Sequence, residues 1–158
     1  MKIKKVCVLG AGTLGTRVAL QAALSGYEVS LYDINLKSLK GAKEVMETIV
    51  TKLAKASGLE SESGLMAIEK ITFTKDPKVA VHEADIINES VLEEVSVKTE
   101  VWKLFGEIAP EKTIFTTNTS YLLPSMFAEV SGRPSRFCAF HFHDVFTAKV
   151  VDIMPHPG

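Results

Sequence analysis

The feature that most constrains this chain is a short glycine-rich segment near its start, GAGTLG at residues 10–15. It follows the apolar run VCVL and precedes a stretch whose apolar residues recur at helical spacing, so the segment joins a strand to a helix. Glycines spaced G-x-G-x-x-G in that context form the turn of a dinucleotide-binding unit. We expect Gly10 to permit the tight turn, Gly12 to let the backbone approach a pyrophosphate, and Gly15 to allow close packing of the helix on the strand.

The helix that begins inside this motif would present its unpaired backbone N–H groups to the phosphates. A second strand-like run ends in Asp33, which lies 18 residues after Gly15. An acidic residue roughly 20 residues after the motif hydrogen-bonds the ribose hydroxyls of the adenosine. Its charge disfavours the 2′-phosphate of NADP, and Ile34 and Asn35, which follow it, provide no cation to bind that group. The predicted cofactor is therefore NAD, held by Gly10, Gly12, Thr13, Leu14, Gly15 and Asp33.

Strand-like runs and helical stretches alternate along the rest of the chain. This order is typical of βαβ units, which form a parallel sheet with helices on both faces. A long helical stretch after the second strand is interrupted at residues 57–65 and a shorter one follows, which predicts a helical hairpin. We therefore expect an α/β fold, a Rossmann-type doubly wound and mainly parallel sheet with a helical hairpin insertion after the second strand. The strands are expected at Lys5–Leu9, Glu28–Tyr32, Ile71–Thr74, Asp85–Asn88, Thr113–Thr117, Phe137–Phe140 and Val150–Ile153.

Length and composition exclude several classes of protein. The chain has 158 residues, 46% of them hydrophobic and 23% charged, values typical of a single globular domain. Its net charge of −1 provides no basic surplus for a nucleic-acid or membrane-surface partner. No stretch reaches the ~20 apolar residues of a membrane span, and the apolar run at the N-terminus is too short for a signal peptide. We expect a soluble, cytoplasmic protein whose partner is a small-molecule substrate.

Further segments follow the predicted strands in an order that matches a known family. They are NESVLEE at residues 88–94, TNTSYL at 117–122, and HFHDVF followed by VVDIMPHPG near the C-terminus. They resemble the E-x-V-x-E, S-N-T-S and H-F-F-N-P segments of the NAD-binding domain of the 3-hydroxyacyl-CoA dehydrogenases, and the resemblance covers essentially the whole chain. It implies an NAD-dependent enzyme of fatty acid metabolism. Such an enzyme oxidises the 3-hydroxyl of an L-3-hydroxyacyl-CoA to a 3-oxoacyl-CoA by hydride transfer.

The resemblance also implies roles for individual residues. His141 matches the family's catalytic base, and Asp152 stands where the family has a glutamate that orients this imidazole, if one residue is deleted between the two. An imidazole suits proton transfer near neutral pH, and a carboxylate beside it fixes its tautomer. Ser120 would bind the substrate oxygen with Asn118 nearby. The catalytic set implied is His141, Asp152, Ser120 and Asn118, with Glu89, Lys98 and Asn118 contacting the cofactor near its nicotinamide.

The chain departs from the family's pattern directly after His141. His143, Asp144 and Val145 replace the family's Phe, Asn and Pro. Both histidines would share one face of a continuing strand, an arrangement that suits zinc. No cysteine or third histidine lies at ligand spacing, however, so we expect no metal site.

Two alternatives to an acyl-CoA dehydrogenase remain open from the sequence. The ending VDIMPHPG resembles the same region of the gulonate and carnitine dehydrogenases, which act on small hydroxy acids. Family members also carry a second, helical domain that closes over the acyl chain and forms a dimer interface, whereas we expect residues 1–158 to form the NAD-binding domain alone. We therefore expect either an inactive fragment of a homodimeric enzyme or an NAD(H)-binding module without turnover.

Overall fold

The structure, a computed structural model, describes residues 2–57, 61–147 and 150–156. Its strands are β1 (Lys5–Leu9), β2 (Glu28–Tyr32), β3 (Thr72–Thr74), β4 (Ile86–Glu89), β5 (Ile114–Thr117), β6 (Phe137–Phe142) and β7 (Val151–Pro155). Its helices are α1 (Thr13–Leu24), α2 (Leu36–Ser57), α3 (Glu62–Glu69), α4 (Pro77–Val81), α5 (Val95–Ile108) and α6 (Ser125–Ala128), with a 3-10 turn at Pro134–Arg136. β1 and β2 have the predicted bounds, and the other strands differ from prediction by one or two residues at their ends.

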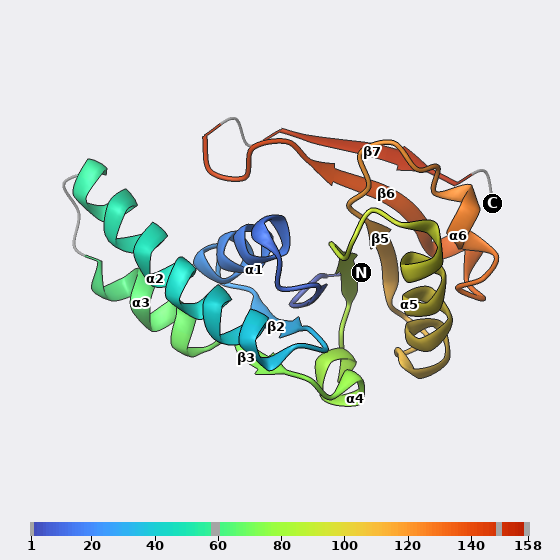
Figure 1. The fold of residues 1–158 in the computed structure, drawn as a ribbon, viewed down its shortest axis with the longest axis horizontal. Helices are drawn as coiled ribbons and strands as arrows, with labels where there is room; N and C mark the ends of the chain where they lie inside the picture. The colour runs from blue at the N-terminus through green and yellow to red at the C-terminus, as the bar shows by residue number, and fades with distance from the viewer. Residues whose placement is uncertain (1, 58–60, 148–149, 157–158) are drawn as a thin grey trace.

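The strands form one sheet in the order β3-β2-β1-β4-β5-β6-β7 (Figure 1). Neighbouring strands from β3 to β6 run parallel, and β7 is antiparallel to β6. The strand order reverses at β1, which lies between β2 and β4, as in a doubly wound Rossmann-type sheet. The predicted fold class is confirmed.

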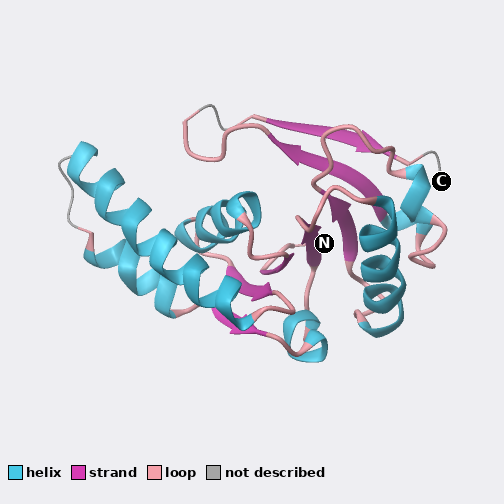
Figure 2. Ribbon diagram, in the orientation of Figure 1, coloured by secondary structure: helices cyan, strands magenta, loops and turns pink. Residues whose placement is uncertain are grey.

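Helices cover both faces of this sheet (Figure 2). On one face α1, α2 and α3 pack against β1 and β2, where Leu20, Leu31 and Met46 are fully buried. On the other face α4 and α5 form a second core, in which the rings of Trp102 and Phe115 stack with their centroids 5.1 Å apart. Burial on both faces explains why the strands consist of nearly continuous apolar runs.

The helical hairpin predicted after the second strand is formed by α2 and α3, and residues 58–60 between them lie outside the described residues. The two helices approach closely at Gly64, where a Cβ atom would lie 2.5 Å from Cγ1 of Val50. Lys43 of α2 and Glu69 of α3 add an ion pair at 2.9 Å. Within the described ranges, none of the helices combines the length and apolar character needed to cross a membrane.

β6 extends two residues beyond its predicted end, which corrects the expected position of His141. β7 pairs with this extension, placing Asp152 opposite His141 and Val151 opposite Phe142. The parallel neighbour β5 ends opposite Ala139, so the antiparallel partner provides the pairing that continues β6. The sequence had suggested that His141 follows the strand, whereas the structure places it inside β6.

Candidate active site

The glycine-rich turn between β1 and α1 is shaped by two close contacts. Gly10 has a φ of 100°, in the left-handed region, and a Cβ atom there would lie 2.6 Å from the carbonyl oxygen of Ser90. A Cβ atom at Gly15 would lie 2.0 Å from the carbonyl oxygen of Gly10. At Gly12, by contrast, a Cβ atom would meet no described atom within 4 Å. Two of the glycines are thus required by the packing of the turn itself, and the third borders open space.

The N-terminus of α1 faces this open space and can bind an anion. Its N-cap is Gly12, which has no side chain to cap the helix, and the first turn contains no acidic residue. The first backbone hydrogen bond of the helix runs from the N–H of Thr16 to the carbonyl oxygen of Gly12, at 3.0 Å. The N–H groups of residues 13–15 therefore have no carbonyl partner within the helix, and the helix dipole adds partial positive charge there. This is where Thr13 and Leu14 were predicted to meet the pyrophosphate.

The carboxylate of Asp33 is fixed beside the same turn. Asp33 follows β2, and its Oδ2 accepts a hydrogen bond from the N–H of Ala11 at 2.8 Å. Its Oδ1 accepts from the N–H of Asn35, also at 2.8 Å. The two backbone donors hold the side chain in one orientation at the rim of the site, while each carboxylate oxygen keeps a further lone pair for a ligand.

A cavity of about 750 Å³ lies between these two features and the segment that follows β4. Gly10, Gly12 and Asp33 line one side, and the opposite wall is formed by the segment after β4 and by α5. A volume in the range of about 300–1,000 Å³ suits a ligand pocket. The cavity lies at the carboxyl ends of the strands where the strand order reverses, the position at which doubly wound sheets bind their ligands.

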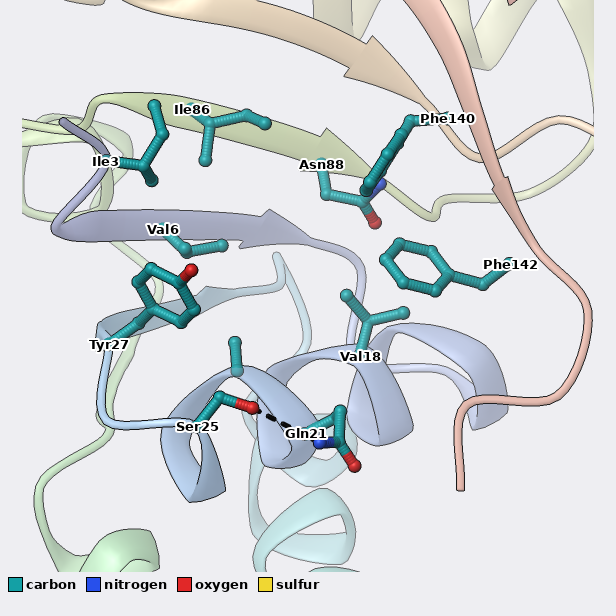
Figure 3. A pocket seen from close by; sticks show the side chains of 11 residues that line it. Ile3, Val6, Val18, Gln21, Ser25, Tyr27, Ile86, Asn88, Phe140 and Phe142 are labelled. Carbon is teal, nitrogen blue, oxygen red and sulfur yellow. Dashed lines mark hydrogen bonds between the residues drawn. The ribbon is translucent and has the colours of Figure 1, made fainter. Parts of the chain in front are cut away.

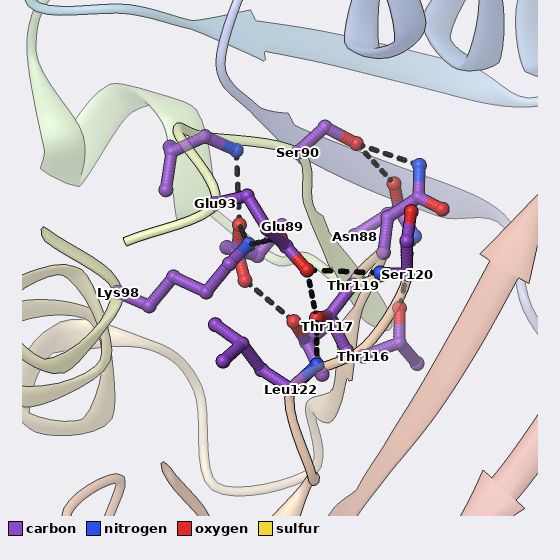
Figure 4. Close-up of polar contacts among 12 residues, drawn as sticks. Asn88, Glu89, Ser90, Glu93, Lys98, Thr116, Thr117, Thr119, Ser120 and Leu122 are labelled. Carbon is purple, nitrogen blue, oxygen red and sulfur yellow. Dashed lines mark hydrogen bonds and ion pairs between the residues drawn. The ribbon is translucent and has the colours of Figure 1, made fainter. Parts of the chain in front are cut away.

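Behind this cavity lies a buried group of charges centred on Lys98 (Figure 4). The Nζ atom of Lys98 is 2.6 Å from Oε1 of Glu89 and 3.1 Å from Oε2 of Glu93. Glu89 also accepts hydrogen bonds from the hydroxyl of Thr117 at 2.6 Å and from the N–H of Val91 at 2.9 Å. The side chains of Lys98 and Glu89 are both 0% exposed. Neither side chain lines the cavity, and their contact with the cofactor stays a prediction.

Glu93 is the member of this group that lines the cavity, and it was not among the predicted site residues. Its side chain is 26% exposed, and its Oε1 accepts hydrogen bonds from the hydroxyl of Thr119 and from the N–H of Ser120, the latter at 2.9 Å. Burial opposes its charged form, but these hydrogen bonds and the Lys98 ammonium outweigh burial and lower the pKa of Glu93 below its ordinary value. The signal was available in the sequence, since Glu93 is the second glutamate of the E-x-V-x-E pattern.

The loop after β5 contains both Asn118 and Ser120, which the structure places differently. Asn118 is buried; its Nδ2 donates to Oγ of Ser90 and its Oδ1 accepts from the N–H of Phe142, each at 3.0 Å. Its amide therefore joins the ends of β4, β5 and β6, and its contact with cofactor and substrate stays a prediction. Ser120 is exposed at the rim, and its backbone N–H is the group bound to Glu93.

β6 presents different side chains on its two faces. Phe140 and Phe142 point into a second, largely apolar cavity of about 320 Å³ beside α1, with Asn88 and Val18 on its walls (Figure 3). His141, which alternates with them along the strand, belongs to the opposite face. The cavity beside α1 is therefore separated by the sheet from the imidazole that was predicted to act as a base.

The face that carries His141 also carries His143 and Asp152, and their contacts differ from the prediction. Oδ2 of Asp152 lies 2.6 Å from Nε2 of His143, whereas Nδ1 of His141 is buried and has no hydrogen-bond partner among the described residues. The two imidazole rings meet edge to face, with their centroids 4.9 Å apart. Asp152 lies directly opposite His141 in the strand pairing but reaches along the strand to the next side chain on that face. The predicted orienting bond between Asp152 and His141 is not formed in this structure.

Asp144, another residue in which the chain departs from the family's pattern, stabilises the turn after β6. Its Oδ1 accepts hydrogen bonds from the N–H groups of Thr147 at 2.7 Å and Phe146 at 2.9 Å. These bonds lower the pKa of Asp144 below its ordinary value. Its role is thus local, in the geometry of the chain between β6 and β7.

The chain is similar to known proteins in both sequence and structure. The family model described as 3-hydroxyacyl-CoA dehydrogenase, NAD binding domain, matches residues 5–158. A probable 3-hydroxybutyryl-CoA dehydrogenase of Bacillus subtilis is 33% identical over 156 residues, which cover 98% of this chain and 54% of that protein. The mitochondrial hydroxyacyl-coenzyme A dehydrogenase of Homo sapiens is 33% identical over 161 residues, covering 98% and 51%. The chain thus spans about half the length of these curated relatives.

Two solved structures are similar to this chain over nearly its whole length. A diketoreductase described as acting on dicarbonyl compounds superposes with a TM-score of 0.91 at 36% identity, covering 97% of this chain and 55% of that one. A 3-hydroxybutyryl-CoA dehydrogenase of Escherichia coli superposes with a TM-score of 0.89 at 27% identity, covering 97% and 32%.

Proposed function

We propose that this chain forms the cofactor-binding part of a dehydrogenase that oxidises L-3-hydroxyacyl-CoA to 3-oxoacyl-CoA. The chain belongs to the family of the 3-hydroxyacyl-CoA dehydrogenase NAD-binding domain, and the proposal proceeds from that membership. The observation that carries this proposal is the meeting of two predicted catalytic segments. The N–H of Phe142, next to His141, donates to Asn118, two residues before Ser120. The segment bearing the imidazole and the loop bearing the hydroxyl are thereby joined.

The residues of the chain fit the cofactor of this family, which is NAD. The open Cβ position of Gly12 and the unpaired N–H groups at the start of α1 suit the pyrophosphate. The fixed carboxylate of Asp33 suits the two hydroxyls of the adenosine ribose and repels a 2′-phosphate. When bound, NAD supplies the acceptor for the hydride that leaves the substrate.

The chain's own part in the reaction is to hold the substrate and move a proton. His141 takes the proton of the 3-hydroxyl as the hydrogen on the same carbon leaves as hydride, and the carbon–oxygen bond becomes a carbonyl. The exposed hydroxyl of Ser120 hydrogen-bonds the substrate oxygen throughout. In the reverse direction the imidazolium returns the proton to the carbonyl oxygen. Asp152 stabilises the charged ring when its carboxylate contacts His141 in the site with cofactor and substrate bound.

A second candidate substrate is a small hydroxy acid or its carbonyl product. It is favoured by the resemblance of the VDIMPHPG segment to the gulonate and carnitine dehydrogenases and by the similarity to a diketoreductase at 36% identity. The catalytic residues would have the same roles, because both substrate classes present a secondary alcohol. The difference would lie in the groups that bind the rest of the substrate.

The proposal includes partners for the rest of the enzyme. We propose that the protein acts with a second, helical domain, because the chain spans about half the length of its curated relatives, and as a homodimer, which the family resemblance implies. Light scattering of the full-length protein measures the dimer directly. A monomer at working concentration would remove this part of the proposal.

The function is tested by following NADH consumption by the full-length protein with acetoacetyl-CoA, a 3-oxo sugar acid and dehydrocarnitine. Turnover of acetoacetyl-CoA above the other two supports the acyl-CoA proposal, and the reverse order supports the small hydroxy acid. His141→Ala should lower kcat by about 10²–10⁴-fold and leave the Kd for NADH nearly unchanged. NADH binding without turnover of any substrate would identify a binding module and overturn the proposal.

A further inference from the structure

We propose that His143 is a positioning residue of this site, which anchors the Asp152 carboxylate so that its second oxygen can face Nδ1 of His141. This inference rests on the proposed function, since it concerns the orientation of the proposed base. His143 was not among the predicted site residues. The two imidazoles would then share one carboxylate.

The first part of this arrangement is already formed. Oδ2 of Asp152 lies 2.6 Å from Nε2 of His143, a short hydrogen-bonding distance. The side chains of His143 and Asp152 are 50% and 55% exposed, and exposed pairs of this kind contribute little to stability. The value of this contact therefore lies in the geometry that it imposes on the carboxylate.

The second part follows from the position of His141. In the antiparallel pairing Asp152 lies directly opposite His141, where Cβ atoms on the same face are about 4.5–5.5 Å apart. Nδ1 of His141 is buried without a partner in the part of the chain that the structure describes, and a buried polar atom of this kind calls for an explanation. The carboxylate has a second oxygen, Oδ1, and Nδ1–H is the donor that it would accept from.

The length of the side chain explains why an anchor is needed. Asp152 carries a single methylene between backbone and carboxylate, so its oxygens stay close to its own backbone. Oδ2 can contact His143 while Oδ1 faces His141 only if the plane of the carboxylate is held between the two rings. The His143 ring provides that hold, because it lies edge to face against the His141 ring at 4.9 Å. The row formed by His143, Asp152 and His141 would thus fix the tautomer of the proposed base.

Kinetics of the full-length protein test this role through a rescue. His143→Phe keeps an aromatic ring but removes the nitrogen, and it should lower kcat by about 10-fold to 10²-fold with the KM for NADH unchanged, since a misplaced catalytic group has costs of that order. His143→Gln, which retains an N–H donor, should keep more of the activity. Adding Asp152→Glu to His143→Phe should recover kcat, because a side chain longer by one methylene reaches His141 without an anchor. His82→Phe, on the exposed end of α4, is the matched control.

NMR of the histidine rings tests the same inference without any turnover. Long-range proton–nitrogen spectra report which ring nitrogen carries the proton. We expect Nδ1 of His141 to be the protonated nitrogen in the wild type, and its signal to shift in both Asp152→Asn and His143→Phe. A His141 signal identical in wild type and His143→Phe would overturn the inference, as would an unchanged kcat in that variant.

The two proposals can fail separately. If no hydroxyacyl or hydroxy acid substrate is turned over, the proposed function fails, and the ring spectra still decide whether His143 anchors the carboxylate that orients His141. If turnover is found and His143→Phe changes neither kcat nor the His141 signal, the function stands and the anchoring role is excluded. The unfolding midpoint of His143→Phe should stay near that of the wild type, which separates positioning from a structural effect.

Discussion

The side-chain amide of Asn118 joins the strand of the proposed base to the neighbouring strands, since its Oδ1 accepts from the N–H of Phe142 at 3.0 Å. Its Nδ2 donates at the same time to Ser90, whose carbonyl oxygen limits the space at Gly10. A chain of contacts thus runs from the glycine-rich turn to the segment that bears His141. The cofactor end and the catalytic end of the site are held in one frame.

Asn118→Ala should therefore lower kcat more than it weakens coenzyme binding. Loss of the bond to Phe142 loosens the strand next to His141, and displacement of a catalytic group can cost about 10²-fold in rate. Asn118→Asp keeps an acceptor for Phe142 and should retain more activity. Steady-state kinetics and NADH titration of both variants measure the effect. A rise in the Kd for NADH with kcat unchanged would instead make Asn118 a direct cofactor contact.

Asp33→Ala should weaken NADH binding and reduce the preference for NADH over NADPH. Hydrogen bonds to a charged group contribute about 1.5–3 kcal/mol, which corresponds to a loss of about 10-fold to 10²-fold in affinity. Removing the carboxylate also removes its repulsion of a 2′-phosphate. Calorimetric titration with both coenzymes measures this, with Glu111→Ala, an exposed acid beyond the end of α5, as a control for net charge. Equal Kd values for NADH in the wild type and Asp33→Ala would show that the ribose is held elsewhere.

Gly15→Ala and Gly41→Ala should change stability in opposite directions. A Cβ atom at Gly15 would lie 2.0 Å from a backbone oxygen in the turn, so the alanine displaces the turn, lowers the unfolding free energy and weakens NADH binding. At Gly41, inside α2, a Cβ atom meets nothing within 4 Å, and alanine should stabilise the helix by about 0.5–1 kcal/mol. Denaturant unfolding of the two variants decides the matter. Two alanines of equal effect would contradict the close contact at Gly15.

Lys98→Met should destabilise the protein by about 3–5 kcal/mol, because it leaves the carboxylates of Glu89 and Glu93 without the ammonium between them. Adding Glu89→Gln should recover part of the loss by removing one of the unpaired charges. Lys103→Met, which breaks an exposed pair with Glu100 on the same helix, is the control and should cost about 1 kcal/mol or less. Urea unfolding compares the three. A Lys98→Met variant as stable as Lys103→Met would contradict the buried pairing.

The sequence predicted best what depends on local patterns. The glycine-rich turn, the strands and the helical hairpin each follow from residue spacing within a short segment, and the structure forms all of them. The burial of Lys98 could not be predicted from local spacing, because a lysine on an amphipathic helix is ordinarily solvent-exposed. Its two partners, Glu89 and Glu93, lie outside that helix. The partner of Asp152 could not be foreseen either. It depends on the pairing of β6 with β7 and on the reach of one short side chain, which together direct the carboxylate to His143.

Asp85 should make the protein less stable in acid, in a defined pH window. The hydrogen bond from Lys112, with further bonds from the N–H groups of Lys5 and Lys4, lowers the pKa of this carboxyl from 3.8 to about 2. A carboxyl whose pKa is lower in the folded protein than in the unfolded chain stabilises the fold above the unfolded value. This contribution is lost as the pH falls from about 4 to about 2, where the folded protein in turn takes up the proton.

Asp85→Asn should remove this pH dependence, so that its unfolding free energy changes less than that of the wild type as the pH falls from about 4 to about 2. Lys112→Met should reduce the slope partly, since it removes the largest cause and leaves the two backbone donors. Urea unfolding at a series of pH values measures all three proteins. Parallel curves for the wild type and Asp85→Asn would show that other carboxyls account for the acid sensitivity, because only the difference between the curves belongs to Asp85.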